Sequence, residues 1–188
     1  MRTKEEYRIQ IQSQRSALTS QEWKFMSEAV CHNLLEVEAL ASAKRVHSFW
    51  PLLDKKEVDI RPFLNHMNQS GVEIFLPVMR GAQMHHGIFK GEDAMTSGQF
   101  GILEPTEFEA FFPDHLDAVI IPALALDYNG NRIGYGQGIY DRFLSSVHCP
   151  LISPIFSHQI VSGIPMESHD VCVHMLVTEH HIHHVKNV

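Results

Sequence analysis

The hydrophobic positions of this chain first follow a helical period and then turn into short apolar runs. Thr3 with Glu6, and Thr19 with Glu22, have capping-box spacing, so they predict the starts of two helices. The second helix is expected to bury a stripe of side chains at helical spacing, because an amphipathic helix turns one face to the core. That stripe consists of Trp23, Met26, Val30, Leu34 and Val37.

Short apolar runs farther along the chain predict β-strands at residues 45–50, 72–78, 118–124, 151–156 and 171–177. A helix is expected at residues 62–68, because Pro62 suits a first turn and Gly71 can close the segment. Residues 80–116 are expected to form irregular excursions or hairpins. Strands that alternate with helices predict a single three-layer α/β domain over residues 1–188, with a mainly parallel sheet flanked by helices.

Composition narrows the classes of function. The chain of 188 residues is 44% hydrophobic, its first residues are charged, and no segment approaches the roughly 18 apolar residues of a membrane span. Three cysteines without paired or zinc-type spacing favour a reducing compartment. A formal net charge of -7 argues against a broad nucleic-acid interface. We therefore expect a cytoplasmic monomer whose partner is a small molecule, with neither nucleic acid nor membrane.

The segment that carries chemistry has glycines at alternate positions, Gly134, Gly136 and Gly138, between a predicted strand and a predicted helix. Glycine lets backbone N–H groups approach a ligand, and such groups near a helix start bind phosphate. Arg132 adds a fixed cation, and Asp141 supplies a hard oxygen ligand suited to magnesium. The alternative is that the glycines only build a tight turn, and neither the dinucleotide nor the Walker pattern is present.

The whole string from Arg132 to Asp141 resembles the nucleotide loop of the 5-formyltetrahydrofolate cyclo-ligase family, Arg-(Leu/Ile)-Gly-x-Gly-x-Gly-Tyr-Tyr-Asp. Further matches are Lys4 and Arg8 four residues apart, the acidic segment at Glu57, the segments at residues 102–105 and 122–127, and Asp170 with residues 177–179. Together they span nearly the whole chain in the family's order.

The resemblance implies roles for individual residues. The implied ATP-binding set is Lys4, Arg8, Arg132, Ile133, Gly134, Tyr135, Gly136, Gln137, Gly138, Ile139 and Tyr140. The implied folate-binding set is Trp50, Glu57, Tyr135, Gly136, Gln137, Gly138 and Ile139. Arg132, Tyr140 and Asp141 are the implied catalytic residues, and Asp141 and the position of His174 the implied metal ligands.

Three positions depart from the family pattern. Ile139 replaces the first tyrosine of Tyr-Tyr-Asp, and Gln137 stands where relatives often have lysine. His174 replaces an aspartate assigned to magnesium, and imidazole suits softer metals such as manganese better. We favour the interpretation that His174 has left the coordination shell, so that Asp141, ATP oxygens and waters hold the metal.

The implied activity is the ATP-dependent closure of 5-formyltetrahydrofolate to 5,10-methenyltetrahydrofolate, with Mg²⁺, or alternatively Mn²⁺, as the metal. One alternative is a paralogue on the same scaffold that binds a nucleotide or a pterin-like ligand without this reaction. Another is a non-enzymatic metal-binding protein, because 14 histidines include the cluster at residues 180–184.

Overall fold

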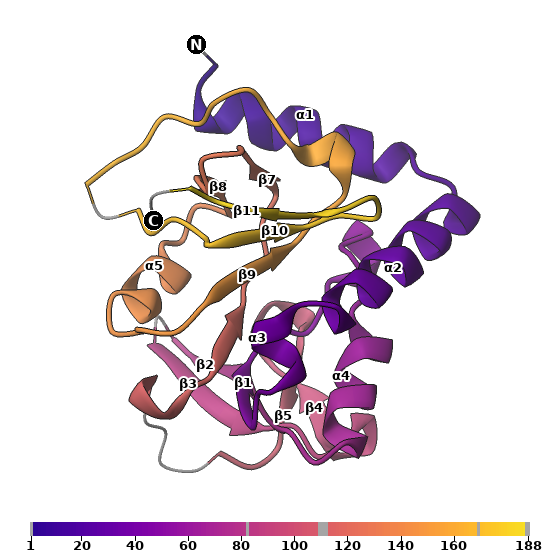
Figure 1. The fold of residues 1–188 in the computed structure, drawn as a ribbon, viewed down its shortest axis with the longest axis vertical. Helices are drawn as coiled ribbons and strands as arrows, with labels where there is room; N and C mark the ends of the chain where they lie inside the picture. Colours follow the sequence, from indigo (N-terminus) through magenta and orange to yellow (C-terminus); the bar gives the residue numbers. More distant parts are fainter. Residues whose placement is uncertain (1, 82, 109–112, 169, 187–188) are drawn as a thin grey trace.

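A computed structural model describes residues 2–81, 83–108, 113–168 and 170–186. Figure 1 shows a twisted central sheet with helices on both faces. The helices are α1 (Lys4–Ala17), α2 (Ser20–Leu35), α3 (Glu38–Ala41), α4 (Arg61–Gln69) and α5 (Ile139–Leu144). The strands are β1 (Arg45–His47), β2 (Glu73–Arg80), β3 (Gln83–Ile88), β4 (Met95–Ser97), β5 (Leu103–Pro105), β6 (Ala118–Ile120), β7 (Ala125–Leu126), β8 (Arg132–Ile133), β9 (Leu151–Pro154), β10 (Met175–Val177) and β11 (Ile182–His184).

The main sheet has seven strands in the order β11-β10-β9-β6-β1-β2-β3. Its five inner strands pair in parallel, and β3 and β11 add an antiparallel strand at each edge. The pairs β4–β5 and β7–β8 form separate two-stranded ribbons. The predicted α/β class with a mainly parallel sheet is confirmed.

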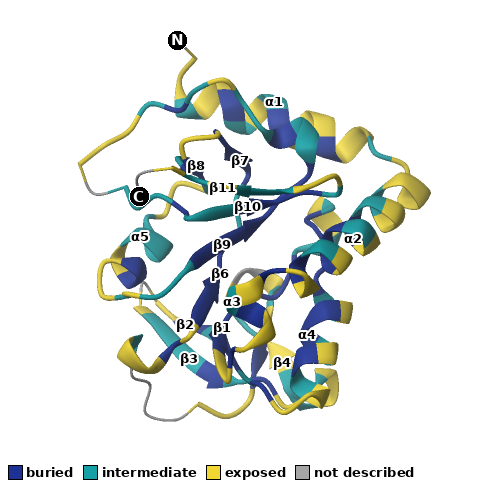
Figure 2. Cartoon of the chain, in the orientation of Figure 1, coloured by how far each residue is buried: buried dark blue, intermediate teal, exposed yellow. Residues whose placement is uncertain are grey.

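Alternate side chains of the inner strands pack into two hydrophobic cores, one on each face of the sheet. Ile74, Ile120 and Ile152 pack with α2, α3 and α4, whereas Val119 and Leu151 pack with α5. Figure 2 shows the central strands β1, β6 and β9 in dark blue, whereas the edge strands β3 and β11 are mostly of intermediate burial. The period of two in a strand makes this double-sided burial possible, which explains why the strands read as continuous apolar runs.

Both predicted helix starts are confirmed, because Thr3 and Thr19 are the N-caps of α1 and α2 and each forms a capping box with a glutamate. The core-facing stripe of α2 is also present, with Val30 and Leu34 fully buried. Helix α1 packs differently from the others. It lies across the β7–β8 hairpin, to which it contributes Tyr7 and Ile11.

Three predicted strands were too long at their carboxyl ends, and one was too long at its start. The 45–50 and 151–156 runs pair only as β1 and β9, and the 118–124 run ends at Ile120. Ile121 N–H still donates to the Ile152 carbonyl of β9, and the chain then leaves the sheet, so that Leu124 N–H donates to the Ile133 carbonyl of the β7–β8 hairpin. The 171–177 run pairs only from Met175. The residues freed from the sheet are those that position the site.

Candidate active site

The β7–β8 hairpin carries the glycine loop, and one buried carboxylate fixes its shape. Asp127 accepts hydrogen bonds from the backbone N–H groups of Asn129, Asn131 and Ile164, at 2.9 to 3.0 Å. A carboxylate that accepts several N–H bonds holds its segment firmly, because each bond is charge-assisted. The hairpin therefore presents Arg132 and the following glycines at the carboxyl-terminal side of the sheet, where open α/β sheets bind ligands.

The glycine loop lies against Arg8 of α1. Arg8 Nε donates to the Gly134 carbonyl at 3.0 Å, and a Cβ at Gly136 would stand 3.4 Å from Arg8 Nη2. Gly136 and Gly138 have φ values of +88° and +60°, which L side chains rarely adopt. The structure thus brings Arg8 to the loop to which the sequence assigned phosphate binding.

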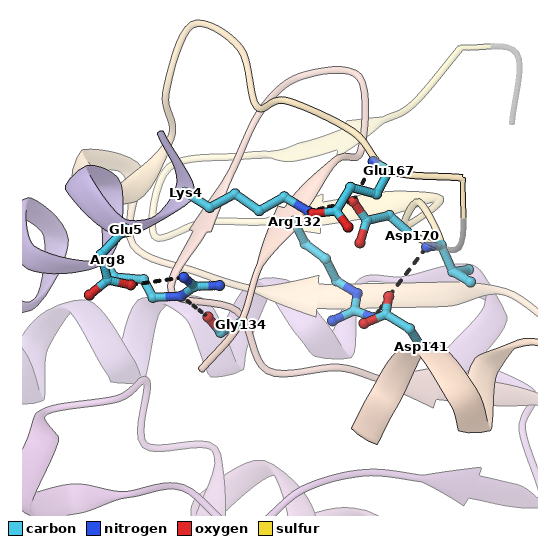
Figure 3. Close-up of polar contacts among 9 residues, drawn as sticks. Lys4, Glu5, Arg8, Arg132, Gly134, Asp141, Glu167 and Asp170 are labelled. Carbon is cyan, nitrogen blue, oxygen red and sulfur yellow. Dashed lines mark hydrogen bonds and ion pairs between the residues drawn. The ribbon is translucent and has the colours of Figure 1, made fainter. Parts of the chain in front are cut away.

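Arg132 and Asp141 face one another across the end of this loop (Figure 3). Arg132 Nη2 lies 2.5 Å from Asp141 Oδ1, and the two side chains are only 6% and 17% exposed. Val171 N–H also reaches Asp141 Oδ1, at 3.4 Å. Both described donors use Oδ1, which leaves Oδ2 for another ligand. Arg132 Nε is buried without a hydrogen-bond partner among the described residues.

Tyr140 comes immediately before this aspartate in α5, and its hydroxyl is buried without a partner among the described residues. Burial and the nearby Glu57 carboxylate raise the pKa of the Tyr140 phenol, whereas Arg132 opposes the rise. The hydroxyl therefore stays protonated at neutral pH. An unpaired buried donor beside a charged pair is typical of a site shaped for a ligand.

Lys4 reaches toward the same place from the start of α1. Its Nζ lies 2.6 Å from Asp170 and 3.3 Å from Glu167, and Figure 3 shows it extended above Arg132 toward Asp170. Burial lowers the pKa of Lys4, but the two carboxylates outweigh burial and the pKa is raised. Lys4 is therefore a fixed cation at the edge of the Arg132–Asp141 pair.

Glu57 lies behind the loop and is buried. Its Oε1 accepts a hydrogen bond from the Tyr135 hydroxyl at 2.6 Å, and its Oε2 accepts one from Leu52 N–H at 2.9 Å. Trp50 is buried as well, with its ring centroid 5.6 Å from that of Phe89. A buried carboxylate whose oxygens retain free lone pairs can accept N–H groups of a heterocycle.

Arg15 is the residue of this region that the sequence did not single out. Its side chain is 2% exposed, and its Nη2 donates to the Tyr135 hydroxyl at 2.9 Å. The signal available was its position eleven residues after Lys4 on α1, which places both residues near the same helix face.

The remaining loop residues contribute in different ways. The Ile133 side chain is buried against Tyr7 and Ile11, so only its backbone can meet a ligand. The Gln137 side chain is exposed, and its carbonyl accepts from Arg142 Nη1 at 3.3 Å.

Ile139 lines a groove of about 550 Å³ between α5 and β3. Arg142 and Phe143 of α5 and His86 of β3 also line it, and His86 Nδ1 lies 3.0 Å from Nε2 of the buried His47. Burial lowers the pKa of His86 to about 4, so its ring is neutral at physiological pH. The groove thus adjoins the glycine loop, and its lining mixes apolar and polar side chains, Arg142 among them.

His174 lies at the junction of β9 and β10, where its Nδ1 accepts a hydrogen bond from Leu151 N–H at 2.8 Å. Burial lowers its pKa, so the ring is neutral and only Nε2 remains for another partner. Within the described ranges, no group of three His, Cys, Asp or Glu side chains could hold a metal. His174 as a metal ligand therefore stays a prediction, and the geometry gives its ring a role in joining two strands.

The C-terminal histidine cluster forms part of β11 and the turn before it. His183 stacks edge-on against Tyr128, with centroids 5.0 Å apart, and His180 Nε2 lies 3.5 Å from Glu179. In the part of the chain that the structure describes, no helix is long and apolar enough to cross a membrane.

Comparisons with known proteins identify the family of this chain. Residues 1–179 match the 5-formyltetrahydrofolate cyclo-ligase family. Proteins named 5-formyltetrahydrofolate cyclo-ligase include one from Haemophilus influenzae, 26% identical over 89% of this chain and 93% of the relative, and one from Saccharomyces cerevisiae, 29% identical over 94% and 95%. The solved structure of Aquifex aeolicus 5,10-methenyltetrahydrofolate synthetase is 30% identical, with a TM-score of 0.87 over 98% of this chain and 94% of that one.

Proposed function

This chain belongs to the 5-formyltetrahydrofolate cyclo-ligase family, and we propose that it converts 5-formyltetrahydrofolate and ATP into 5,10-methenyltetrahydrofolate, ADP and phosphate. The observation that carries this proposal is the convergence of Arg8, Arg132 and Asp141 on one glycine loop. Cations at both sides of exposed backbone amides suit a triphosphate. Because the net charge is -7, such local positive charge is needed for an anionic ligand.

The folate ring is proposed to bind at Glu57, behind the same loop. This carboxylate is buried, and the Tyr135 hydroxyl and Leu52 N–H hold it in place. A fixed, buried carboxylate can favour a heterocycle that donates N–H groups to its remaining lone pairs over one that does not. The groove beside Ile139 offers room for the rest of the ligand.

The chemistry is a phosphoryl transfer followed by ring closure. The formyl oxygen on N5 attacks the γ-phosphorus, and the bond to the departing ADP oxygen breaks. N10 then attacks the formyl carbon, the carbon–oxygen bond breaks, and phosphate leaves as N10 loses its proton. An amide oxygen is a weak nucleophile, so positioning contributes much of the rate enhancement.

The residues of this chain act on charge and on geometry. Arg132 and the loop amides stabilise the negative charge that builds on the transferred phosphoryl group. Lys4 and Arg8 orient the phosphates from α1, and the Tyr140 hydroxyl is placed to donate a hydrogen bond within the site. No covalent enzyme nucleophile is needed.

Magnesium is the proposed metal. Asp141 Oδ2 is the carboxylate oxygen available to a metal, because Arg132 and Val171 N–H both contact Oδ1. Magnesium usually binds only one or two carboxylates, and phosphates and waters complete its coordination shell. The donor set therefore fits, with Asp141 as the protein ligand. Bound there, the ion would neutralise phosphate charge.

We further propose a cytoplasmic monomer. The three cysteines are free, and burial raises the pKa of Cys31 and Cys149 to about 11, which keeps both as thiols. Thiols of this kind are stable in a reducing compartment.

The deciding assay is incubation of the purified protein with 5-formyltetrahydrofolate and Mg-ATP while methenyl absorbance is followed. We expect absorbance to rise only when both substrates are present, with one ADP formed for each methenyl product. Binding of both ligands without product would instead indicate a paralogue that has lost the reaction. Failure to bind either ligand would refute the proposal.

A further inference from the structure

Arg15 carries a buried guanidinium that the proposed mechanism does not use. Its side chain is 2% exposed, yet its nearest carboxylate contact is Nη1 to Glu57 Oε1 at 4.0 Å. Its Nη2 donates instead to the Tyr135 hydroxyl, and its Nε has no hydrogen-bond partner among the described residues. Arginine is rarely buried unless it is paired, so this position calls for a reason beyond packing.

The reason lies in a hydrogen-bond relay between α1 and the site. Arg15 donates to Tyr135 at 2.9 Å, and Tyr135 donates to Glu57 at 2.6 Å. A phenol can accept one hydrogen bond and donate another. The bond from the arginine therefore polarises the Tyr135 hydroxyl and strengthens its bond to the carboxylate. Arg15 thereby serves as a counter-ion for buried Glu57 through a hydroxyl that belongs to a different segment.

That segment is the glycine loop itself. Tyr135 stands between Gly134 and Gly136, and Gly136 has a positive φ. Tyr135 is 38% exposed, and Lys55 Nζ lies over its ring at 5.1 Å from the centroid. The bonds of the Tyr135 hydroxyl tie the glycine loop to Glu57 on one side and to Arg15 on the other.

We propose that Arg15 and Tyr135 are positioning residues that fasten the glycine loop to Glu57, so that nucleotide at the loop and folate at Glu57 strengthen one another's binding. The proposal rests on the proposed function, because it requires both ligands. A ligand that fixes the loop also fixes the Tyr135 hydroxyl, and the hydroxyl fixes the carboxylate that meets the other ligand. Linkage makes the effect equal in both directions.

Calorimetry with a non-hydrolysable ATP analogue and magnesium tests this coupling. For the unaltered protein we expect saturating 5-formyltetrahydrofolate to lower the Kd of the analogue at least about fivefold, a coupling of about 1 kcal/mol. Tyr135→Phe retains the ring and removes the hydroxyl. In this variant we expect saturating 5-formyltetrahydrofolate to change the Kd of the analogue by less than about twofold. Tyr128→Phe is the matched control, because Tyr128 is an exposed tyrosine that stacks on His183, outside the site. It should retain the full coupling.

Arg15→Met gives an independent arm of the test, with Arg15→Lys as the conservative variant. If the relay is one unit, Arg15→Met and Tyr135→Phe each abolish coupling, and the double variant shows no further loss. Arg15→Lys, which keeps the charge, should restore part of it. Should Arg15→Met fail to fold, the Tyr135→Phe measurement decides alone.

Several outcomes would overturn the inference. Full coupling in Tyr135→Phe would refute the relay. Binding of both ligands to the unaltered protein with no mutual effect would refute the coupling and leave the proposed function intact. A protein that binds neither ligand would refute both.

Discussion

Replacement of Asp141 by asparagine separates the catalytic role of this side chain from its structural one. The change keeps the shape but removes the charge that lies 2.5 Å from Arg132 Nη2. Removal of one partner from a buried ion pair costs about 3–5 kcal/mol, and because Asp141 remains 17% exposed we expect about 1–2 kcal/mol here. For a chain of 188 residues, that lowers Tm by about 2–8 °C.

Turnover should fall by more than this loss of stability explains. If Asp141 holds the metal and orients Arg132, its loss removes at least about 1.4 kcal/mol of transition-state stabilisation, which is about tenfold in kcat. Arg132→Ala should lower kcat at least as much. Both are measured as initial rates of methenyl formation at 25 °C, well below the expected Tm. In a magnesium titration, the Asp141 variant should need a higher magnesium concentration to reach half of its maximal rate.

Asp59→Asn is the matched control for this experiment. Asp59 pairs with Arg61 at 2.8 Å and is also 17% exposed, but its hydrogen-bond partners lie in α2 and α4, not in the glycine loop. It should lose similar stability while its kcat changes by less than about twofold. Normal turnover and normal magnesium dependence in folded Asp141→Asn would show that the Arg132–Asp141 pair is only structural.

Glu57→Gln should raise the Kd of 5-formyltetrahydrofolate at least about tenfold and that of the ATP analogue, measured alone, by less than about threefold; equal losses by calorimetry would contradict the placement of the folate ring. His174→Ala should lower the free energy of unfolding by about 1 kcal/mol, because Leu151 N–H loses its acceptor, while the magnesium and manganese dependence of activity stays unchanged. A large loss of metal affinity would place His174 in the coordination shell after all. Burial lowers the pKa of His86 from 6.5 to about 4. As the pH falls below 6.5, the His86 imidazole is therefore protonated in the unfolded chain but stays neutral in the folded chain. Stability should therefore decrease by about 2 kcal/mol between pH 6.5 and 4, and urea unfolding should show a shallower decrease for His86→Gln.

Features encoded by neighbouring residues were predictable from the sequence. Thr3 and Thr19 cap their helices because the hydroxyl and the N3 glutamate lie within one turn, whatever the rest of the fold does. The class of sheet followed from apolar runs that alternate with helical segments. The glycine loop was visible because its chemistry lies within ten consecutive residues.

Features that depend on distant contacts were not predictable in the same way. The run at residues 118–124 is apolar throughout, yet its strand ends at Ile120, because after one further bond from Ile121 N–H to β9 the chain turns away and Leu124 bonds the β7–β8 hairpin instead. Arg15 looks like a solvent-facing residue until the fold brings Tyr135 and Glu57 against it, 120 and 42 positions further along. Likewise, nothing local to His174 indicates that Leu151 N–H will occupy its Nδ1.

Helix α1 sets a strict length between its charged residues. Lys4, Arg8 and Arg15 lie 4 and 7 positions apart within Lys4–Ala17, and at about 100° per residue all three fall within about 40° of one another around the helix axis. One inserted or deleted residue between Arg8 and Arg15 would swing Arg15 by about 100°, away from Tyr135, whereas exposed Ile9 can change freely. Substitutions on the outer face of this helix are therefore tolerated, whereas an inserted turn would restore the angle of Arg15 but move it about 5 Å along the helix axis, away from Tyr135. Alignments of working relatives should accordingly be free of gaps here.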